Sequence, residues 1–260
     1  MEKKISLGVM EQPVMRQKEI GEKEEKEIKE VFDHVSHVEG KYLATLEFLK
    51  ERVEALGGGK PLILHAQYPP QGDEDMLNLG NTAFPSQFGD RFSQIIKMFD
   101  PEWISFHLGF SCEKILSRGQ FDFAIGQSEI IPEDVLRQRM LENIEFVRKT
   151  YLRRGEILLE NLDYNPKDKS GAYEYVCDPD FIDSLLTASK CGMLLDIGHA
   201  NCSAQNMGYD KIMDFIFKLP LEKVVEIHMS GAGTKDGWHT IPIIPSTRKG
   251  SQRLDTSRKS

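Results

Sequence analysis

Short apolar runs recur along the chain, and five of them end on a polar residue whose side chain binds metal ions well. The five terminal residues are His65, His107, Glu160, Asp196 and His228. Apolar runs of this length, separated by helical stretches, indicate buried parallel strands, because both faces of such a strand are covered. Parallel strands joined by helical crossovers all end on the same face of the sheet. We therefore expect the five polar side chains to converge at one end of the fold.

Two further strands and a set of helices are predicted elsewhere in the chain. The additional strands are predicted over residues 5–10 and 34–38, and the helices over 19–30, 42–56, 88–99, 132–152, 179–189 and 210–218. The apolar spacing of residues 42–56 stops at three glycines, where a helix C-cap belongs. Residues 68–85 are rich in Pro, Gly, Asp and Asn, and predict a long loop after the third strand.

The alternation of strands and helices predicts an α/β fold of the (β/α)₈ barrel type. A doubly wound sheet fits less well, because no glycine-rich phosphate loop follows the first strand. Seven strands are predicted and an eighth is not evident, so we expect a barrel that is incomplete at its C-terminus. Strand edges are then unpaired, which a truncated chain, a partner that closes the gap, or a shifted reading frame would each explain.

We expect one barrel domain over residues 1–245 and a disordered polar, basic tail over residues 246–260. The tail has one apolar residue, Leu254, so it buries too little surface to offset the entropy of ordering. A length of 260 residues agrees with a single barrel domain.

Charge and cysteine usage narrow the class of protein. The chain has 33 basic and 41 acidic residues and a net charge of −8, which argues against general nucleic-acid binding. The four cysteines form no CxxC pair, which argues against a disulfide framework or a zinc finger. No signal peptide or run of membrane-spanning length is evident. We expect a soluble, cytoplasmic protein with reduced thiols and no membrane partner.

The candidate chemistry comes from the histidines. Five of the seven lie at or just beyond predicted strand ends, and three acidic residues accompany them there. The set comprises His65, His107, Glu160, Asp196, His199, His228, Asp236 and His239. These imidazole and carboxylate donors suit zinc, iron or manganese and are poor for calcium. The sequence therefore predicts a site for divalent metal ions at the C-terminal rim of the barrel.

Spacing adds detail to this site. Asp196 ends a strand and His199 follows three residues later in the predicted turn, so the pair can serve two neighbouring ions. Glu226 shares one side of its strand with His228, because side chains alternate with period two. Glu226 either orients a metal ligand through a hydrogen bond or pairs with a basic residue of a neighbouring strand.

The order of these residues resembles that of the xylose-isomerase-like TIM barrels, which include sugar isomerases and epimerases and the endonuclease IV repair enzymes. Matched by motif, the resemblance to endonuclease IV implies three ions. The first would be held by His65, His107 and Glu160, the second by Glu160, Asp196 and His228, and the third by His199, Asp236 and His239.

A narrower resemblance rests on residues 191–199, 203–210 and 219–231, and on Leu-Leu-Glu-Asn at 158–161. These segments look like the multinuclear non-haem iron enzymes of the methanobactin-biosynthesis-oxidase type. The resemblance implies two or three iron ions, the use of oxygen to remodel cysteines of a peptide substrate, and often a partner protein.

The chain departs from this family pattern at three places. The residue before the strand-four histidine is Phe106 instead of a glutamate. Asp236 and His239 are separated by two residues instead of one. The last metal-binding glutamate has no counterpart after Ile244, which would remove one carboxylate from the second ion.

Four functions remain open at this stage. The first is an iron-dependent oxidative enzyme that acts on a peptide or a small molecule, and the second is a divalent-metal sugar or sugar-phosphate isomerase or epimerase. In the isomerase, Glu160 would bridge substrate and ion, and Glu226 would move a proton, which makes both candidate catalytic residues. The third is a zinc-dependent abasic-site endonuclease, which the acidic charge balance disfavours. The fourth is a degenerate, non-catalytic barrel that serves only as a binding or scaffold protein, which the missing strand favours. Independently of the function, a partner protein or a second copy of the chain can cover the open barrel edge.

Overall fold

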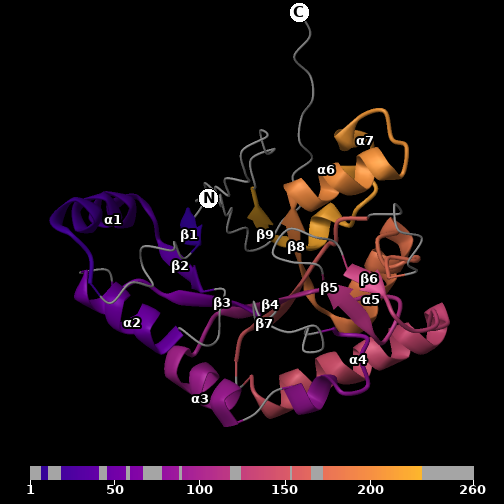
Figure 1. Cartoon of the computed structure of the whole chain (residues 1–260), viewed down its shortest axis with the longest axis horizontal. Helices are drawn as coiled ribbons and strands as arrows, with labels where there is room; N and C mark the ends of the chain where they lie inside the picture. Colours follow the sequence, from indigo (N-terminus) through magenta and orange to yellow (C-terminus); the bar gives the residue numbers. More distant parts are fainter. Residues whose placement is uncertain are drawn as a thin grey trace, which may run out of the picture.

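The computed structural model describes residues 7–10, 19–40, 46–56, 59–66, 78–87, 90–117, 124–152, 154–164 and 172–229. Within these ranges seven parallel strands alternate with helices and form one strongly curled sheet (Figure 1). The described part of the chain adds no eighth strand to this sheet, which agrees with an incomplete barrel. The predicted tail, Asp236 and His239 lie outside the described residues.

The sheet has the strand order β1-β2-β3-β4-β7-β8-β9, and every neighbouring pair is parallel. Its strands are β1 (Gly8–Met10), β2 (His37–Gly40), β3 (Leu62–Ala66), β4 (Trp103–His107), β7 (Glu156–Glu160), β8 (Gly192–Asp196) and β9 (Val224–His228). The register aligns the ends of neighbouring strands: His107 lies opposite Glu160, and Asp196 lies opposite His228. Polar residues that are far apart in sequence therefore become neighbours.

Helices cover the convex side of the sheet (Figure 1). They are α1 (Glu22–His34), α2 (Leu46–Ala55), α3 (Asp90–Phe99), α4 (Glu133–Thr150), α5 (Pro179–Ser189), α6 (Ile197–Asn206) and α7 (Ile212–Ile216), with 3₁₀ turns η3 (Phe84–Gln87) and η4 (Leu221–Lys223). Helix α4 shows why they lie there, because its buried residues Leu136, Met140, Ile144 and Val147 recur at helical spacing and form one apolar face. Burial of each such side chain contributes about 1.5–3 kcal/mol.

Most predicted strand ends are confirmed. The strands β4, β7, β8 and β9 end at the predicted residues, and β3 runs one residue beyond His65 to Ala66. The predicted loop over residues 68–85 lies mostly outside the described ranges, and its last two residues, Phe84 and Pro85, begin η3. None of the described helices is long and apolar enough to cross a membrane.

The second strand was predicted wrongly. His34 is the last residue of α1, and β2 spans His37–Gly40 instead of residues 34–38. The reason is that the buried helical spacing continues from Ile28 to Phe32, so the helix extends past residue 30. The shift places Glu39 inside the strand.

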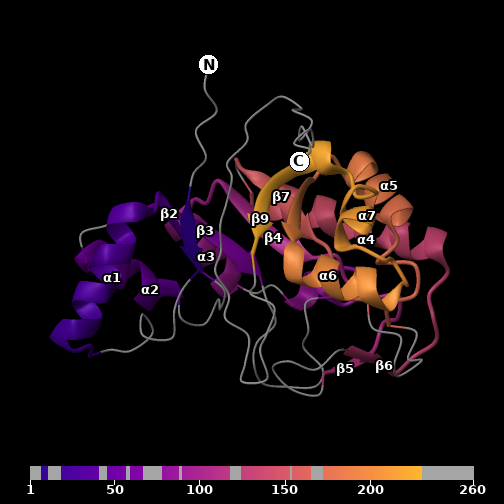
Figure 2. The ribbon, with the colours of Figure 1, turned by 90° about the horizontal axis from the view of Figure 1, so that it is seen from above.

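The elements that were not predicted include a helix and a hairpin. Helix α6 begins directly after β8, so His199 lies in a first helical turn and not in a free turn. A two-stranded antiparallel hairpin, β5 (Ile115–Ser117) and β6 (Ala124–Gly126), follows β4 and stands apart from the main sheet (Figure 2).

Candidate metal centre

The ends of β3, β4 and β7 bring together His65, His107 and Glu160, all of them buried. Nε2 of His65 and Nε2 of His107 each lie 3.1 Å from the same carboxylate oxygen, Oε2 of Glu160. The rings of the two histidines meet edge to face at a centroid distance of 5.2 Å. Two imidazole nitrogens and one carboxylate oxygen therefore converge on a small volume.

This arrangement fits a bound cation. Donors that bind one ion at about 2.1 Å, with angles of about 90–110° at the ion, lie about 3.0–3.4 Å apart. The two distances to Glu160 fall in that range. Nε2 of His65 and Oε2 of Glu160 are buried and have no hydrogen-bond partner among the described residues. Buried polar atoms of this kind need an explanation, and an ion between them supplies one.

A second group forms around Asp196, at the end of β8. Oδ1 of Asp196 accepts a hydrogen bond from the backbone N–H of His199 at 2.8 Å and so caps α6. Nε2 of His199 lies 3.8 Å from both Oε1 of Glu160 and Oδ2 of Asp196. Asn161 fixes the two strand ends, because its amide donates to the Asp196 carbonyl and accepts from the Asp196 N–H.

His228 joins the same group from β9. Its Nδ1 lies 3.5 Å from Oε1 of Glu160 and 4.0 Å from Oδ2 of Asp196. Its Nε2 lies 3.0 Å from Oε2 of Glu39 and 3.3 Å from Oε1 of Glu226. The structure thus brings together the predicted second set, Glu160, Asp196 and His228.

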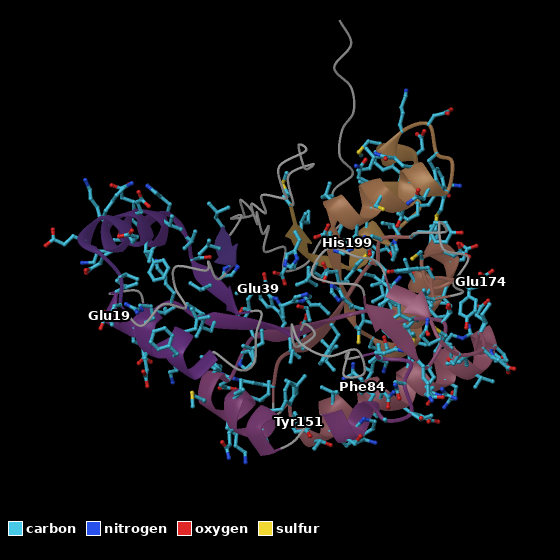
Figure 3. The ribbon with its side chains drawn as sticks, in the orientation of Figure 1. Glu19, Glu39, Phe84, Tyr151, Glu174 and His199 are labelled. Carbon is cyan, nitrogen blue, oxygen red and sulfur yellow. The ribbon has the colours of Figure 1, made fainter. Side chains whose placement is uncertain are left out.

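Sequence reasoning missed three polar residues at this site. Glu39 was missed because the predicted strand stopped at Val38, and Ser105 because it lies inside an apolar run. Asp163 was missed because it lies beyond a strand end. Figure 3 shows Glu39 and His199 on the inner side of the curled sheet.

Ser105 and Asp163 each lie beside the ring nitrogen of a histidine that points away from Glu160. Nδ1 of His65 lies 2.6 Å from Oγ of Ser105, and Nδ1 of His199 lies 3.4 Å from Oδ1 of Asp163. In both rings the other nitrogen, Nε2, faces Glu160. Polar partners on the far nitrogen fix the orientation of metal-binding histidines, so this pattern is typical of such a site.

A comparison with known protein families agrees with this geometry. The family described as RiPP precursor modification enzyme MbnB/TglH/ChrH matches residues 34–246. The chain belongs to this family. The match covers every strand from β2 to β9 and all of the predicted metal-binding residues.

Curated relatives of the chain include proteins named UPF0276 protein. One from Acaryochloris marina is 27% identical over 203 residues, which cover 73% of this chain and 68% of that protein. One from Rhizobium meliloti is 27% identical over 174 residues, which cover 66% of this chain and 49% of that protein. The chain thus spans about half the length of the second relative.

Solved structures support the fold. A D-psicose 3-epimerase from Clostridium cellulolyticum, solved with D-tagatose, aligns with a TM-score of 0.50 and 14% identity over 86% of this chain and 73% of that one. The protein IolI, solved with a zinc atom, aligns with a TM-score of 0.50 and 15% identity over 92% of this chain and 75% of that one. At this identity the likeness shows a common barrel fold.

Several charged side chains of the candidate site are buried. Glu39, Glu160, Asp196 and Glu226 are buried, whereas no lysine or arginine is buried in the described part of the chain. One predicted alternative was that Glu226 pairs with a basic residue of a neighbouring strand. The contacts of Glu226 with the described residues do not include such a pair. Glu226 instead contacts His228 and accepts a hydrogen bond from Trp103 Nε1 at 2.5 Å.

The neighbouring groups shift the pKa values strongly. Burial opposes ionisation of Glu160, but the attraction of His107 and His65 outweighs it and holds the pKa of that carboxyl well below its usual range. Burial also disfavours the charged form of His199, but Asp196 and Asp163 raise its pKa to about 10. Burial and the nearby Glu39 raise the pKa of Glu226 to about 7.

Of the eight predicted metal ligands, the structure brings six to one end of the sheet. They are His65, His107, Glu160, Asp196, His199 and His228. Their binding of metal remains a prediction, and Asp236 and His239 remain expectations that fall outside the described residues.

Proposed function

We propose that this member of the MbnB/TglH/ChrH family is an iron-dependent oxidative enzyme that modifies a cysteine-containing precursor peptide. The observation that carries the proposal is the convergence of the His65 and His107 nitrogens on one oxygen of Glu160. The family match supports the peptide substrate, because RiPP precursors are peptides modified after their synthesis.

The proposed ions are divided among the residues as the motif comparison suggests. His65, His107 and Glu160 would hold the first ion, and Glu160, Asp196 and His228 the second, so that Glu160 bridges the two. His199 would contribute to a third ion with Asp236 and His239. Imidazole and carboxylate donors suit iron, and they also suit the zinc or manganese that we keep as alternatives. Bound iron supplies one-electron chemistry with oxygen.

The side chains around the ions would supply negative charge to the ions and determine which side of the site the substrate can reach. Glu160 is ionised because the neighbouring imidazoles lower its pKa, so it offers a full negative charge to two cations. The side chains of His199 and Asp163 are 27% and 31% exposed, whereas Glu160 is 2% exposed. Among the described residues of the site, those near α6 are the more exposed, and we place the approach of the peptide on that side.

The burial of Glu226 favours the oxidative enzyme over the sugar isomerase. An isomerase needs a carboxylate that touches the substrate and moves a proton. Glu226 is fully buried and contacts His228 and Trp103. We therefore assign it a role that acts through His228. The net charge of −8 weighs against the nuclease.

Elemental analysis tests the proposal. Protein purified without added metal should contain two or three iron ions per chain, with an absorption spectrum that changes between air and reductant. His107→Ala should lose at least one of these ions, whereas His34→Ala, at the exposed end of α1, should retain all of them. Equal metal content in both variants, or no metal in the wild type, would overturn the proposal.

The substrate class has a separate test. A cysteine-containing peptide incubated with the iron-loaded protein should change mass only when oxygen is present, and a cysteine-to-serine version should not change. If the iron-loaded protein leaves every such peptide unchanged, the proposed metal site stands and the proposed peptide substrate is wrong.

A further inference from the structure

The imidazole of His228 lies between two pairs of carboxylates. Its Nδ1 faces Glu160 at 3.5 Å and Asp196 at 4.0 Å, toward the proposed metal ions. Its Nε2 faces Glu39 at 3.0 Å and Glu226 at 3.3 Å, on the other side of the ring. The side chains of His228, Glu39 and Glu226 are at most 3% exposed, so water does not compete for either nitrogen.

Only one nitrogen of a neutral imidazole carries a proton, and the other offers a lone pair to a metal. Carboxylates face both nitrogens of His228, but the pair at Nε2 is closer, at 3.0 and 3.3 Å against 3.5 and 4.0 Å at Nδ1, and the closer pair favours the proton. The proton therefore lies on Nε2, which leaves the lone pair on Nδ1, the nitrogen that faces Glu160 and Asp196.

The carboxylate pair is itself held in place. Glu39 comes from β2 and Glu226 from the same strand as His228, so they approach Nε2 from different strands. Trp103 of β4 donates a hydrogen bond to Oε2 of Glu226 and leaves Oε1 as the oxygen nearest His228. The His65 ring packs edge to face on the His228 ring at 5.6 Å, which restricts rotation of the ring.

We infer that Glu39 and Glu226 are positioning residues that keep a proton on Nε2 of His228 and direct its Nδ1 at the second metal ion. The inference rests on the proposed function insofar as it requires a bound ion. It adds to the site Glu39, which precedes His65, the first of the predicted ligands in the sequence.

Zinc is a suitable probe because it is diamagnetic and the proposed donors bind it. In the zinc-loaded wild type labelled with ¹⁵N histidine, the NMR spectrum should show His228 coordinated through Nδ1 and protonated on Nε2. The His228→Gln variant assigns the signal. Coordination through Nε2, or an uncoordinated His228 beside coordinated His65 and His107, would overturn this inference and leave the proposed metal site standing. If zinc shifts no histidine signal, this inference fails, and the iron content of the purified protein decides separately whether the proposed function stands.

The variants Glu39→Gln and Glu226→Gln keep the shape of the side chain and remove its charge. Each should weaken zinc binding about 10- to 100-fold, the usual effect of losing a polar partner behind a metal ligand. Each should also weaken the Nε2–H signal of His228. Glu102→Gln, an exposed glutamate beside Trp103 in sequence, is the matched control and should change neither. Unchanged affinity and an unchanged His228 signal in both variants would overturn the inference. If a variant fails to fold, the wild-type NMR spectrum still decides it.

Discussion

His107 and Glu160 lie opposite each other at the ends of β4 and β7, with Nε2 of the histidine 3.1 Å from Oε2 of the glutamate. The contact joins two residues that are far apart in sequence, and it depends on the register of two parallel strands. Because Glu160 also contacts His65, His199 and His228, its carboxylate is the common centre of the candidate site.

Replacing Glu160 tests this central role. Glu160→Gln removes the charge that two proposed ions share, so it should abolish binding of at least one ion and weaken the other at least tenfold. Glu156→Gln, at the exposed start of the same strand, is the control and should bind metal normally. The metal content of each variant and its titration with ferrous iron measure the number of bound ions and their affinity. Normal binding by Glu160→Gln would contradict the central position of this carboxylate.

Metal binding should release protons. Without metal, the carboxylates around His199 raise its pKa to about 10, and those around His228 raise its pKa well above the ordinary value, so both rings are charged at neutral pH. A metal binds the neutral ring, so binding of metal should expel roughly one to two protons per chain at pH 7. Calorimetric titrations in buffers of different ionisation enthalpy measure that number. A heat that is independent of the buffer would contradict the predicted charge states.

The metal-free protein should show a related dependence of stability on pH. A histidine whose pKa is raised on folding stabilises the fold most while it is protonated in both states, below about pH 6.5. That contribution is lost as the pH rises through about 10, the folded pKa of His199. The free energy of unfolding of wild type relative to His199→Gln should therefore fall between pH 6.5 and 10. Denaturation in the presence of a chelator measures it, and a difference that does not vary with pH would contradict the assignment.

Much of the site could be predicted from the sequence, because a short apolar run that ends on a polar residue predicts both a buried strand and the residue at its end. His107, Glu160, Asp196 and His228 were placed at strand ends, and parallel topology then required them to meet. No side-chain contact had to be known for that step.

The remaining parts depend on contacts that the local pattern does not contain. Glu39 follows residues 34–38, for which a strand was predicted, and only the packing of Ile28 and Phe32 shows that the helix continues to residue 34. Helix α6 was missed because its sequence contains Gly198 and several weak helix formers. Its start is fixed instead by the Asp196 cap, a contact made by the folded chain.

Phe106 offers a test of one departure from the family pattern. The resemblance noted in the sequence implies a glutamate before the strand-four histidine. Here that position is Phe106, which is buried and packs edge to face on Phe84, with ring centroids 6.0 Å apart. Side chains alternate along a strand, so Phe106 points away from the side that His107 faces. Phe106→Glu would bury a charge among apolar groups and should lower the free energy of unfolding by about 3–5 kcal/mol. Phe106→Leu, which keeps an apolar group, should cost less. Chemical denaturation measures both variants. A stable Phe106→Glu protein with tighter metal binding would contradict this orientation and would place residue 106 in the site.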